Sequence, residues 1–298
     1  MDKLAAMKVF VEIVEHGSLT AAATALDRAP PTIVRTLATL EGELGIRLLT
    51  RTTRRMTLTE EGRVYLDRCR RILADIDEAE RAIAADGGEP RGEIRMTAPV
   101  LFGQRHVMPA LADFVSRYVH VRLELLLLDR VVNLVEEGLD LGVRIGTLGD
   151  SSMIAIPVGR MRRVVVASSD YLEEVGVPQH PDELEGHSCV VFRGLTAGSN
   201  WFFEAKGHRF GVSVRSRFVC NQAAAAVDAC AAGLGFGSFL HYQVEPLLDH
   251  GGLKLVLEAF ETPALPVNLV YPDARLMSPR LRTLVDWMKE TLRSRLAP

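Results

Sequence analysis

The stretch GSLTAAATALDRAPPTIVRTLATLEGELG, residues 17–45, determines the fold of the N-terminal part of the chain. Ser18 is a good N-cap for a short helix over residues 19–26, and the alanines of this helix let another helix approach closely. Two prolines then open a second helix, where proline is tolerated because the first helical N–H groups have no intrahelical partner. The apolar residues of the second helix recur at a helical spacing and predict one buried face: Ile33, Leu37, Leu40 and Leu44.

A further helix precedes this pair. Leu4, Met7, Val11 and Val14 recur at steps of three and four, which predicts a helix that ends near Gly17. Three short helices with a tight turn between the second and the third predict a helix-turn-helix arrangement. The alternative is an ordinary helical bundle with a solvated polar face.

The segment RLLTRTTRR, residues 47–55, carries four arginines and three threonines and no acid. Directly after a helix-turn-helix it predicts a short β wing along DNA, because cations displace condensed counterions and hydroxyls donate hydrogen bonds to phosphates. By itself, a charge run is typical of solvated surface. Residues 28–71 contain ten arginines and five acids, a net charge of +5, whereas the whole chain carries −3 and the remainder therefore −8. This asymmetry favours a nucleic-acid partner.

We expect the exposed first turns of the third helix to enter the major groove of duplex DNA. The candidates for base contact are Thr32, Ile33, Arg35 and Thr36. For Ile33 the alternative is core packing. The candidates for contact with phosphate or the minor groove are Arg51, Arg54 and Arg55, and their alternative is a solvated wing.

A long helix follows over residues 59–86, with Thr57 or Thr59 as its cap and two glutamates at the positive end of its dipole. Its apolar residues alternate in steps of four and three, which is typical of a helix that pairs with a partner helix. These candidate dimerisation residues are Tyr65, Cys69, Ile72, Ile76, Ala79 and Ile83. The alternative is packing against the helix's own domain. Residues 87–91 predict a hinge.

Beyond residue 91, short β runs alternate with helices, which predicts α/β structure with mostly parallel sheets. The expected strands are residues 94–98, 121–128, 141–145, 163–167, 189–192, 214–219, 236–240, 253–257 and 267–271. Helices are clearest over residues 108–118, 222–232 and 279–293. About 200 residues of such alternation exceed one sheet, so we expect two α/β lobes with a ligand crevice between them.

Composition and motifs exclude several classes of protein. Apolar residues make up 48% and charged residues 24% of the chain, which is typical of a globular protein, and 298 residues leave room for two or three domains. No apolar run approaches the length of a membrane span and no signal core opens the chain, so we expect a cytoplasmic protein without membrane contact. The four cysteines and eight histidines show no metal spacing. We therefore expect no metal, no cofactor and no enzymatic activity.

Several blocks of the sequence resemble the LysR-type transcriptional regulators, in family order and over essentially the whole chain. In the N-terminal part these are FV (10–11), GSLTAAA (17–23), PTIVR (31–35), LEGELGIRLL (40–49), RT (51–52) and LTEEG (58–62). In the C-terminal part they are LDLGVRIG (139–146), AAGLGF (231–236), YP (271–272) and SPRLR (278–282). The chain departs from many members at Ala29, Pro30 and Val34, where those members have serine, glutamine and serine.

The resemblance implies a winged helix-turn-helix over residues 1–58, a dimerising linker helix over 59–86, a hinge over 87–91 and an effector-binding domain over 92–298. That domain would consist of two Rossmann-like α/β lobes, as in a periplasmic binding protein, with lobe I over 92–161 and 266–298 and lobe II over 162–265. An effector that favours one assembly state would shift the lobes and so the spacing of the DNA-binding heads.

The effector candidates follow the expected strands. Thr97, Ala98, Pro99 and Val100 precede a helix, where hydroxyl and N–H groups can hold an anion, although Thr97 also fits a simple helix cap. The remaining candidates lie at strand ends or in the loops behind them: Arg144, Phe192, Arg193, Thr196 and Asn221. The two arginines fit an organic anion, such as a carboxylate, held between the lobes, although either could instead be structural. The sequence leaves open whether the effector is an aromatic acid, an aliphatic acid, an amino acid or an uncharged molecule.

The sequence therefore predicts a transcription regulator that binds operator DNA as a homodimer or homotetramer and responds to a small-molecule effector. Contact with RNA polymerase is a further expectation for such a regulator. The alternative is a solute-binding or enzymatic α/β protein with a basic helical docking module. Residues 28–59 distinguish between these two functions and favour the regulator, because a solute-binding protein does not need a helix-turn-helix followed directly by a cationic wing.

Overall fold

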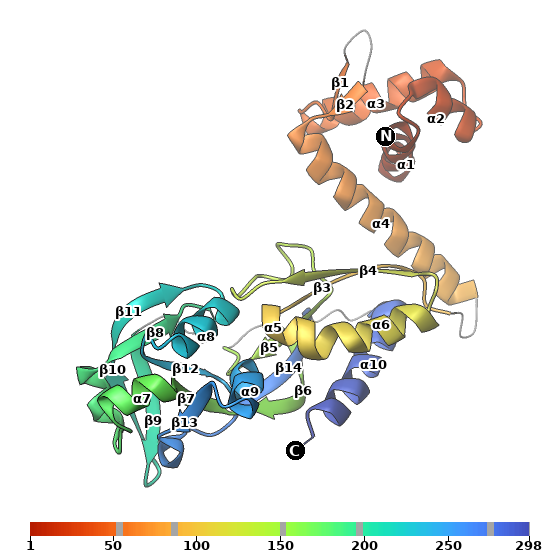
Figure 1. The fold of residues 1–298 in the computed structure, drawn as a ribbon. Coiled ribbons are helices and arrows are strands. Elements are labelled where there is room, and N and C mark those ends of the chain that lie inside the picture. Colours follow the sequence, from red (N-terminus) through yellow and green to blue (C-terminus); the bar gives the residue numbers. More distant parts are fainter. Residues whose placement is uncertain (52–55, 85–88, 150–152, 195–198, 273–276, 298) are drawn as a thin grey trace. The chain divides into compact units, whose positions relative to one another are not determined.

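The computed structural model describes residues 1–51, 56–84, 89–149, 153–194, 199–272 and 277–297 (Figure 1). Its contacts divide the chain into two units, Met1–Gly88 and Glu89–Pro298. The first is mostly helical, whereas the second contains two five-stranded sheets. Among the described residues, no helix is both long enough and apolar enough to span a membrane.

Three helices form the core of the first unit: α1 (Lys3–His16), α2 (Leu19–Ala25) and α3 (Pro30–Leu44). The hydroxyl of Ser18 accepts a hydrogen bond from the backbone N–H of Ala21 and caps α2. Helices α1 and α3 each end at a glycine in the left-handed region, Gly17 with φ 63° and Gly45 with φ 69°, a conformation that glycine adopts without steric cost. The expected three helices are thus present with these bounds.

A two-stranded wing and a long helix complete this unit. Strands β1 (Leu49–Arg51) and β2 (Met56–Leu58) pair antiparallel, and α4 (Glu60–Ala84) follows. Residues 52–55 between the strands, and residues 85–88 after α4, lie outside the described residues. The expected hinge therefore falls in part outside them.

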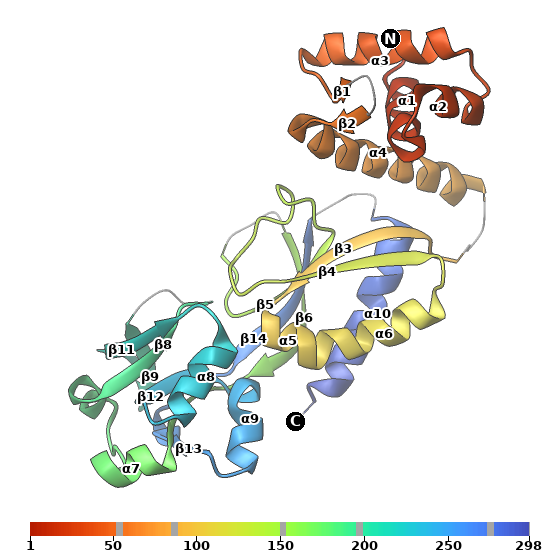
Figure 2. The ribbon, with the colours of Figure 1, turned by 45° about the horizontal axis from the view of Figure 1, so that its top comes forward.

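The first lobe of the second unit is built on a sheet with strand order β4-β3-β5-β14-β6 (Figure 2). Its strands are β3 (Gly92–Ala98), β4 (Val121–Leu127), β5 (Leu141–Ile145), β6 (Met153–Met161) and β14 (Leu265–Pro272). A continuous helical segment of α5 (Val100–Phe102), a π turn (Gly103–Val107) and α6 (Met108–Arg117) shares one apolar core with the sheet and with α10 (Pro279–Arg295). A smaller core that includes Val132, Leu134 and Val270 connects the segment after β4 to the sheet.

The second lobe is built on a sheet with strand order β11-β8-β12-β7-β13. Its strands are β7 (Arg163–Ser168), β8 (Ser188–Phe192), β11 (Arg215–Cys220), β12 (Phe236–Leu240) and β13 (Leu253–Val256). Helices α8 (Ala223–Ala231) and α9 (His241–Asp249) share one core with this sheet. A separate core joins the sheet to α7 (Ser169–Val175) and to the hairpin of β9 (Asn200–Ala205) and β10 (His208–Ser213). Short 3-10 turns cover Pro181–Gly186 and Glu258–Phe260.

Every expected strand is present, but the sheets are mixed, not mostly parallel. In the first lobe β3 pairs parallel with β4 and β5, whereas β14 runs antiparallel to β5 and β6. In the second lobe β8 pairs parallel with β11 and β12, whereas β7 runs antiparallel to β12 and β13. The antiparallel strands are those that carry the chain between the lobes, β6 into β7 and β13 into β14. Local sequence patterns do not show in which direction a strand runs relative to its neighbours.

Candidate functional site

Helix α3 presents a polar face to solvent because its apolar face is buried. Ile33 is completely buried, and Leu37 and Leu40 are each only 1% exposed. Thr32 and Arg35 are exposed, and Thr36 is half-buried. Ile33 is therefore not available to a DNA base, which corrects that expectation: its side chain fills the core that holds α3 against α1 and α2.

A carboxylate fixes the end of α3 against the wing. One oxygen of Glu41, Oε1, accepts hydrogen bonds from the backbone N–H groups of Leu48 and Leu49, at 2.8 and 3.2 Å. Glu41 thereby fixes where β1 begins relative to α3. The sequence reasoning missed this role, since an acid on a helix is usually solvated and its partners lie seven and eight residues away.

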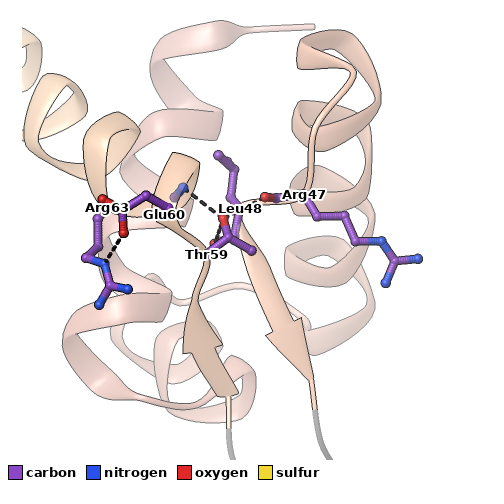
Figure 3. Close-up of polar contacts among 6 residues, drawn as sticks. Arg47, Leu48, Thr59, Glu60 and Arg63 are labelled. Atoms are coloured by element: carbon purple, nitrogen blue, oxygen red, sulfur yellow. Dashed lines mark hydrogen bonds and ion pairs between the residues drawn. The ribbon is translucent and has the colours of Figure 1, made fainter.

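Thr59 joins the wing to α4 (Figure 3). Its hydroxyl donates to the carbonyl of Arg47 at 2.7 Å and accepts from the backbone N–H of Gly62 at 2.9 Å, so Thr59, and not Thr57, is the one of the two candidates that caps α4. Its own N–H donates to the carbonyl of Leu48 at 3.0 Å. A Cβ atom on Gly62 would lie 2.0 Å from that same carbonyl oxygen, so only glycine lets α4 start this close to β1.

The wing carries hydroxyls on its exposed strands. The hydroxyls of Thr50 and Thr57 lie opposite each other across β1 and β2, 2.7 Å apart. The backbone of Arg51 ends β1, but its side chain lies outside what the structure describes, as do Arg54 and Arg55. Arg47, just before β1, is exposed.

The apolar stripe of α4 divides into two parts. Cys69 is fully buried and Tyr65 packs against Phe10 of α1, with ring centroids 5.8 Å apart. The first part of the stripe therefore packs in the core of the N-terminal unit, Met1–Gly88, which we call the head. This corrects the expectation that these two residues face a partner helix. Further along, Ile72 is 39% exposed and Ile76 is half-buried. Ala79 and Ile83 belong to α4, but their side chains lie outside the described ones.

In the second unit, a cleft of about 1300 Å³ opens between the two lobes. Its lining includes the carboxyl ends of β5 and β8, the edge where α/β sheets bind ligands, and also the first residues of β6, β7, β9 and β14. The cleft brings together two predicted residues, Arg144 of the first lobe and Phe192 of the second. It also contains residues that the sequence reasoning missed: Arg160, Arg163, Trp201, Glu204 and Arg209.

Two of the cleft arginines are tied to backbone carbonyls. The guanidinium of Arg144 donates to the carbonyl of Val132, and burial lowers the pKa of Arg144. Arg160 donates from Nη2 to the carbonyl of Ala264 at 2.9 Å. Both side chains are thus held at the cleft while they keep N–H groups available for a ligand.

The loop after β3 does not line the cleft. Thr97 is 5% and Ala98 1% exposed, and Pro99 is also buried. The N–H of Val100 donates to Oδ1 of Asp129 at 3.0 Å. Burial raises the pKa of Asp129, while the backbone N–H groups of Val100 and Ala223 oppose that shift. The expected anion position before α5 is therefore occupied by the chain's own carboxyl group, which corrects the assignment of this loop to the effector.

The remaining effector candidates are not brought into the cleft. Arg193 and Asn221 are exposed and do not line it. Both lie just beyond the ends of β8 and β11, so the sequence pattern located the correct strand ends but not the direction of the side chains. Thr196 lies outside the described residues.

Two family models together cover almost the whole chain. Residues 4–63 match the bacterial regulatory helix-turn-helix protein of the lysR family, and residues 87–293 match the LysR substrate binding domain. An HTH-type transcriptional repressor of Pseudomonas aeruginosa is 35% identical over 297 residues, which cover 97% of this chain and 92% of that protein. The HTH-type transcriptional regulator CrgA of Neisseria meningitidis is 32% identical, with 97% of each chain covered.

Solved structures agree with these relatives. The structure of CrgA, a LysR-type transcriptional regulator from Neisseria meningitidis, matches with a TM-score of 0.60 at 32% identity and covers 97% of this chain and 98% of that one. The full-length structure of AphB, a virulence activator of Vibrio cholerae, matches with a TM-score of 0.61 at 27% identity and covers 96% and 98%. The chain therefore belongs to the LysR family of DNA-binding transcriptional regulators, which respond to small molecules through a two-lobed α/β domain.

Proposed function

We propose that this regulator recognises operator DNA through Thr32, Arg35 and Thr36 on α3, with the wing arginines on the flanking phosphates. The exposed polar face of α3 carries the proposal. Arg35 is exposed and forms no ion pair among the described residues, so its guanidinium is free to contact a base edge. Glu41 supports the same role, because it holds the wing in a fixed register against the recognition helix.

The proposed assembly is a homodimer or homotetramer on an interrupted inverted repeat. The exposed side chain of Ile72, with the half-buried Ile76, supports pairing through the second half of α4.

We further propose that the bound regulator contacts RNA polymerase and catalyses no reaction of its own. The relatives support a regulatory role, since they are named as transcriptional regulators.

The proposed effector site is the cleft between the lobes. Arg144 and Phe192 line it from opposite lobes, so a ligand that contacts both favours one arrangement of the lobes over others. A ligand with equal affinity for both arrangements would shift nothing, however tightly it bound.

Selection of genomic DNA fragments on the purified protein at near-physiological salt tests the DNA-binding role. We expect enrichment of an inverted repeat. On that repeat, Arg35→Ala weakens specific binding by about 5- to 150-fold for each half-site, the cost of about 1–3 kcal/mol for each lost base contact, and relaxes the preference at one position of each half-site.

Arg54→Ala is the comparison variant, because loss of a phosphate contact weakens binding to all sequences alike and flattens the salt dependence. Retention of DNA without a shared sequence, or equal losses on specific and random DNA for Arg35→Ala, would contradict the proposed role of α3.

A further inference from the structure

Two arginines of the second lobe line the same cleft and form no ion pair among the described residues. Arg163 begins β7, Arg209 lies on β10, and both line the cleft. Burial, and then the charge of the neighbouring Arg209, lower the pKa of Arg163. The guanidinium of Arg209 lies over the ring of Phe202, 4.3 Å from its centroid, a contact that holds it at the wall of the cleft.

The described lining of the cleft contains four arginines and a single acid, Glu204. Glu204 lies directly opposite Arg209 in the register of β9 and β10. Even so, no ion pair among the described residues involves Arg163, Arg209 or Glu204. Arg163 is half-buried and Arg209 is exposed, and an anion that contacts both would remove the repulsion between their guanidinium groups.

We propose that Arg163 and Arg209 form an anion subsite for an effector that carries at least two negative charges, such as a dicarboxylate or a phosphate ester. This inference rests on the proposed effector site and names the class of its ligand. Arg144 and Arg160 add two further cations, so the four arginines and Glu204 give the lining a net charge of +3, of which a dianion neutralises two charges and a monoanion only one. The other position suited to an anion, before α5, is occupied by Asp129.

Thermal unfolding of the full chain with paired probes tests the charge requirement. The pairs are butyrate with succinate and benzoate with phthalate, which differ by one carboxylate, with inorganic phosphate as a third arm, all at equal ionic strength. We expect a dianion at about a hundred times its Kd to raise Tm by roughly 5–10 °C and its monoanion partner to raise it far less. A response to phosphate alone indicates a phosphate ester, and a response to dicarboxylates alone indicates a dicarboxylate.

Substitutions locate the effect. Arg163→Gln and Arg209→Gln should abolish the dianion response, whereas Arg193→Gln should keep it, since Arg193 is exposed and does not line the cleft. Equal responses to monoanions and dianions, or an equal loss in Arg193→Gln, would overturn the proposal.

The ligand-free variants also test whether Arg163 belongs to an anion subsite. If Arg163 is part of an anion subsite, its charge is uncompensated in the ligand-free protein. The Arg163→Gln protein then melts at or above the wild-type temperature, because that charge has been removed. If Arg163 is structural, that variant melts below wild type and the proposal fails. Binding of operator DNA by the wild-type protein is measured alongside, and its absence refutes the proposed function. If the protein binds DNA but shows no dianion response, or if Arg163→Gln melts below wild type, only the anion subsite is refuted.

Discussion

Single side chains fix how the wing meets its neighbours in the head. Glu41 binds the first N–H groups of the wing from α3, and Thr59 binds the preceding carbonyl from the start of α4. Both contacts are directed at the backbone, so they set the position of β1 whatever its side chains are. The surface ion pair of Arg63 with Glu60, at 3.2 Å, contributes little by comparison, because both side chains are solvated.

Gly62→Ala should destabilise the head by about 1–3 kcal/mol, the range for overpacking a fitted contact. The added methyl group would clash with the carbonyl oxygen of Leu48. That oxygen cannot move away without breaking the hydrogen bond that it accepts from the backbone N–H of Thr59. Chemical denaturation followed by circular dichroism measures the change.

Gly42→Ala is the matched control, because Gly42 lies within α3 with open space around it. Alanine there should stabilise the helix by about 0.5–1 kcal/mol through its higher helix propensity. Shifts of the same sign in the two variants would contradict the proposed close approach at Gly62.

Helices and strands follow from local patterns to the extent that one face of each is buried. The periodicity of α3 and the alternating β and α segments of the second unit predicted these elements from the sequence. The hairpin of β9 and β10 and the long strand β6 were not predicted. Ile33 shows the limit within an element, since the same first turn of a helix can face DNA or the core, and only its packing against α1 and α2 decides.

The cleft was only partly predictable for a related reason. Arg163 and Arg209 lie 46 positions apart on different sheets and meet only through the fold, so no local spacing indicates them. Asp129 similarly reaches Val100 across 29 positions. Arg144 and Phe192 were found because each lies at the end of a strand with a clear apolar pattern.

Helix α4 should carry the association of the heads in its second half. Ile72→Asp is expected to weaken self-association at least about tenfold, because it places a charge in an apolar seam. Sedimentation equilibrium over a dilution series measures this. Val64→Asp is the control, since Val64 is 58% exposed on the same helix but outside the stripe. Equal weakening by both variants would exclude the stripe as the seam.

The whole chain combines two units whose apolar cores are separate. The buried core residues of the head all lie between Ala6 and Cys69, and those of the second unit lie between Ile94 and Leu292. Communication between effector and DNA can run along the chain, through α4 and the segment after it, or through contacts made in the oligomer. In either case the effector acts only by its preference for one assembly state.

This coupling has to be reciprocal. If dianions in the clefts of the oligomer change the affinity for operator DNA by some factor, operator DNA has to change the product of the dianion affinities over those clefts by the same factor, for which typical values are about 5- to 150-fold per cleft. We expect the two ratios, with the dianion ratio taken as that product, to agree when DNA binding is measured by anisotropy and dianion binding by calorimetry, in the same buffer and at a protein concentration that keeps the oligomer intact. In Arg163→Gln both ratios should fall to about one, that is, neither ligand should change the affinity for the other, because the charge that holds the dianion is lost. Unequal ratios in the wild-type protein would mean that the ligand acts at a second site or changes the oligomeric state, and not through the cleft alone.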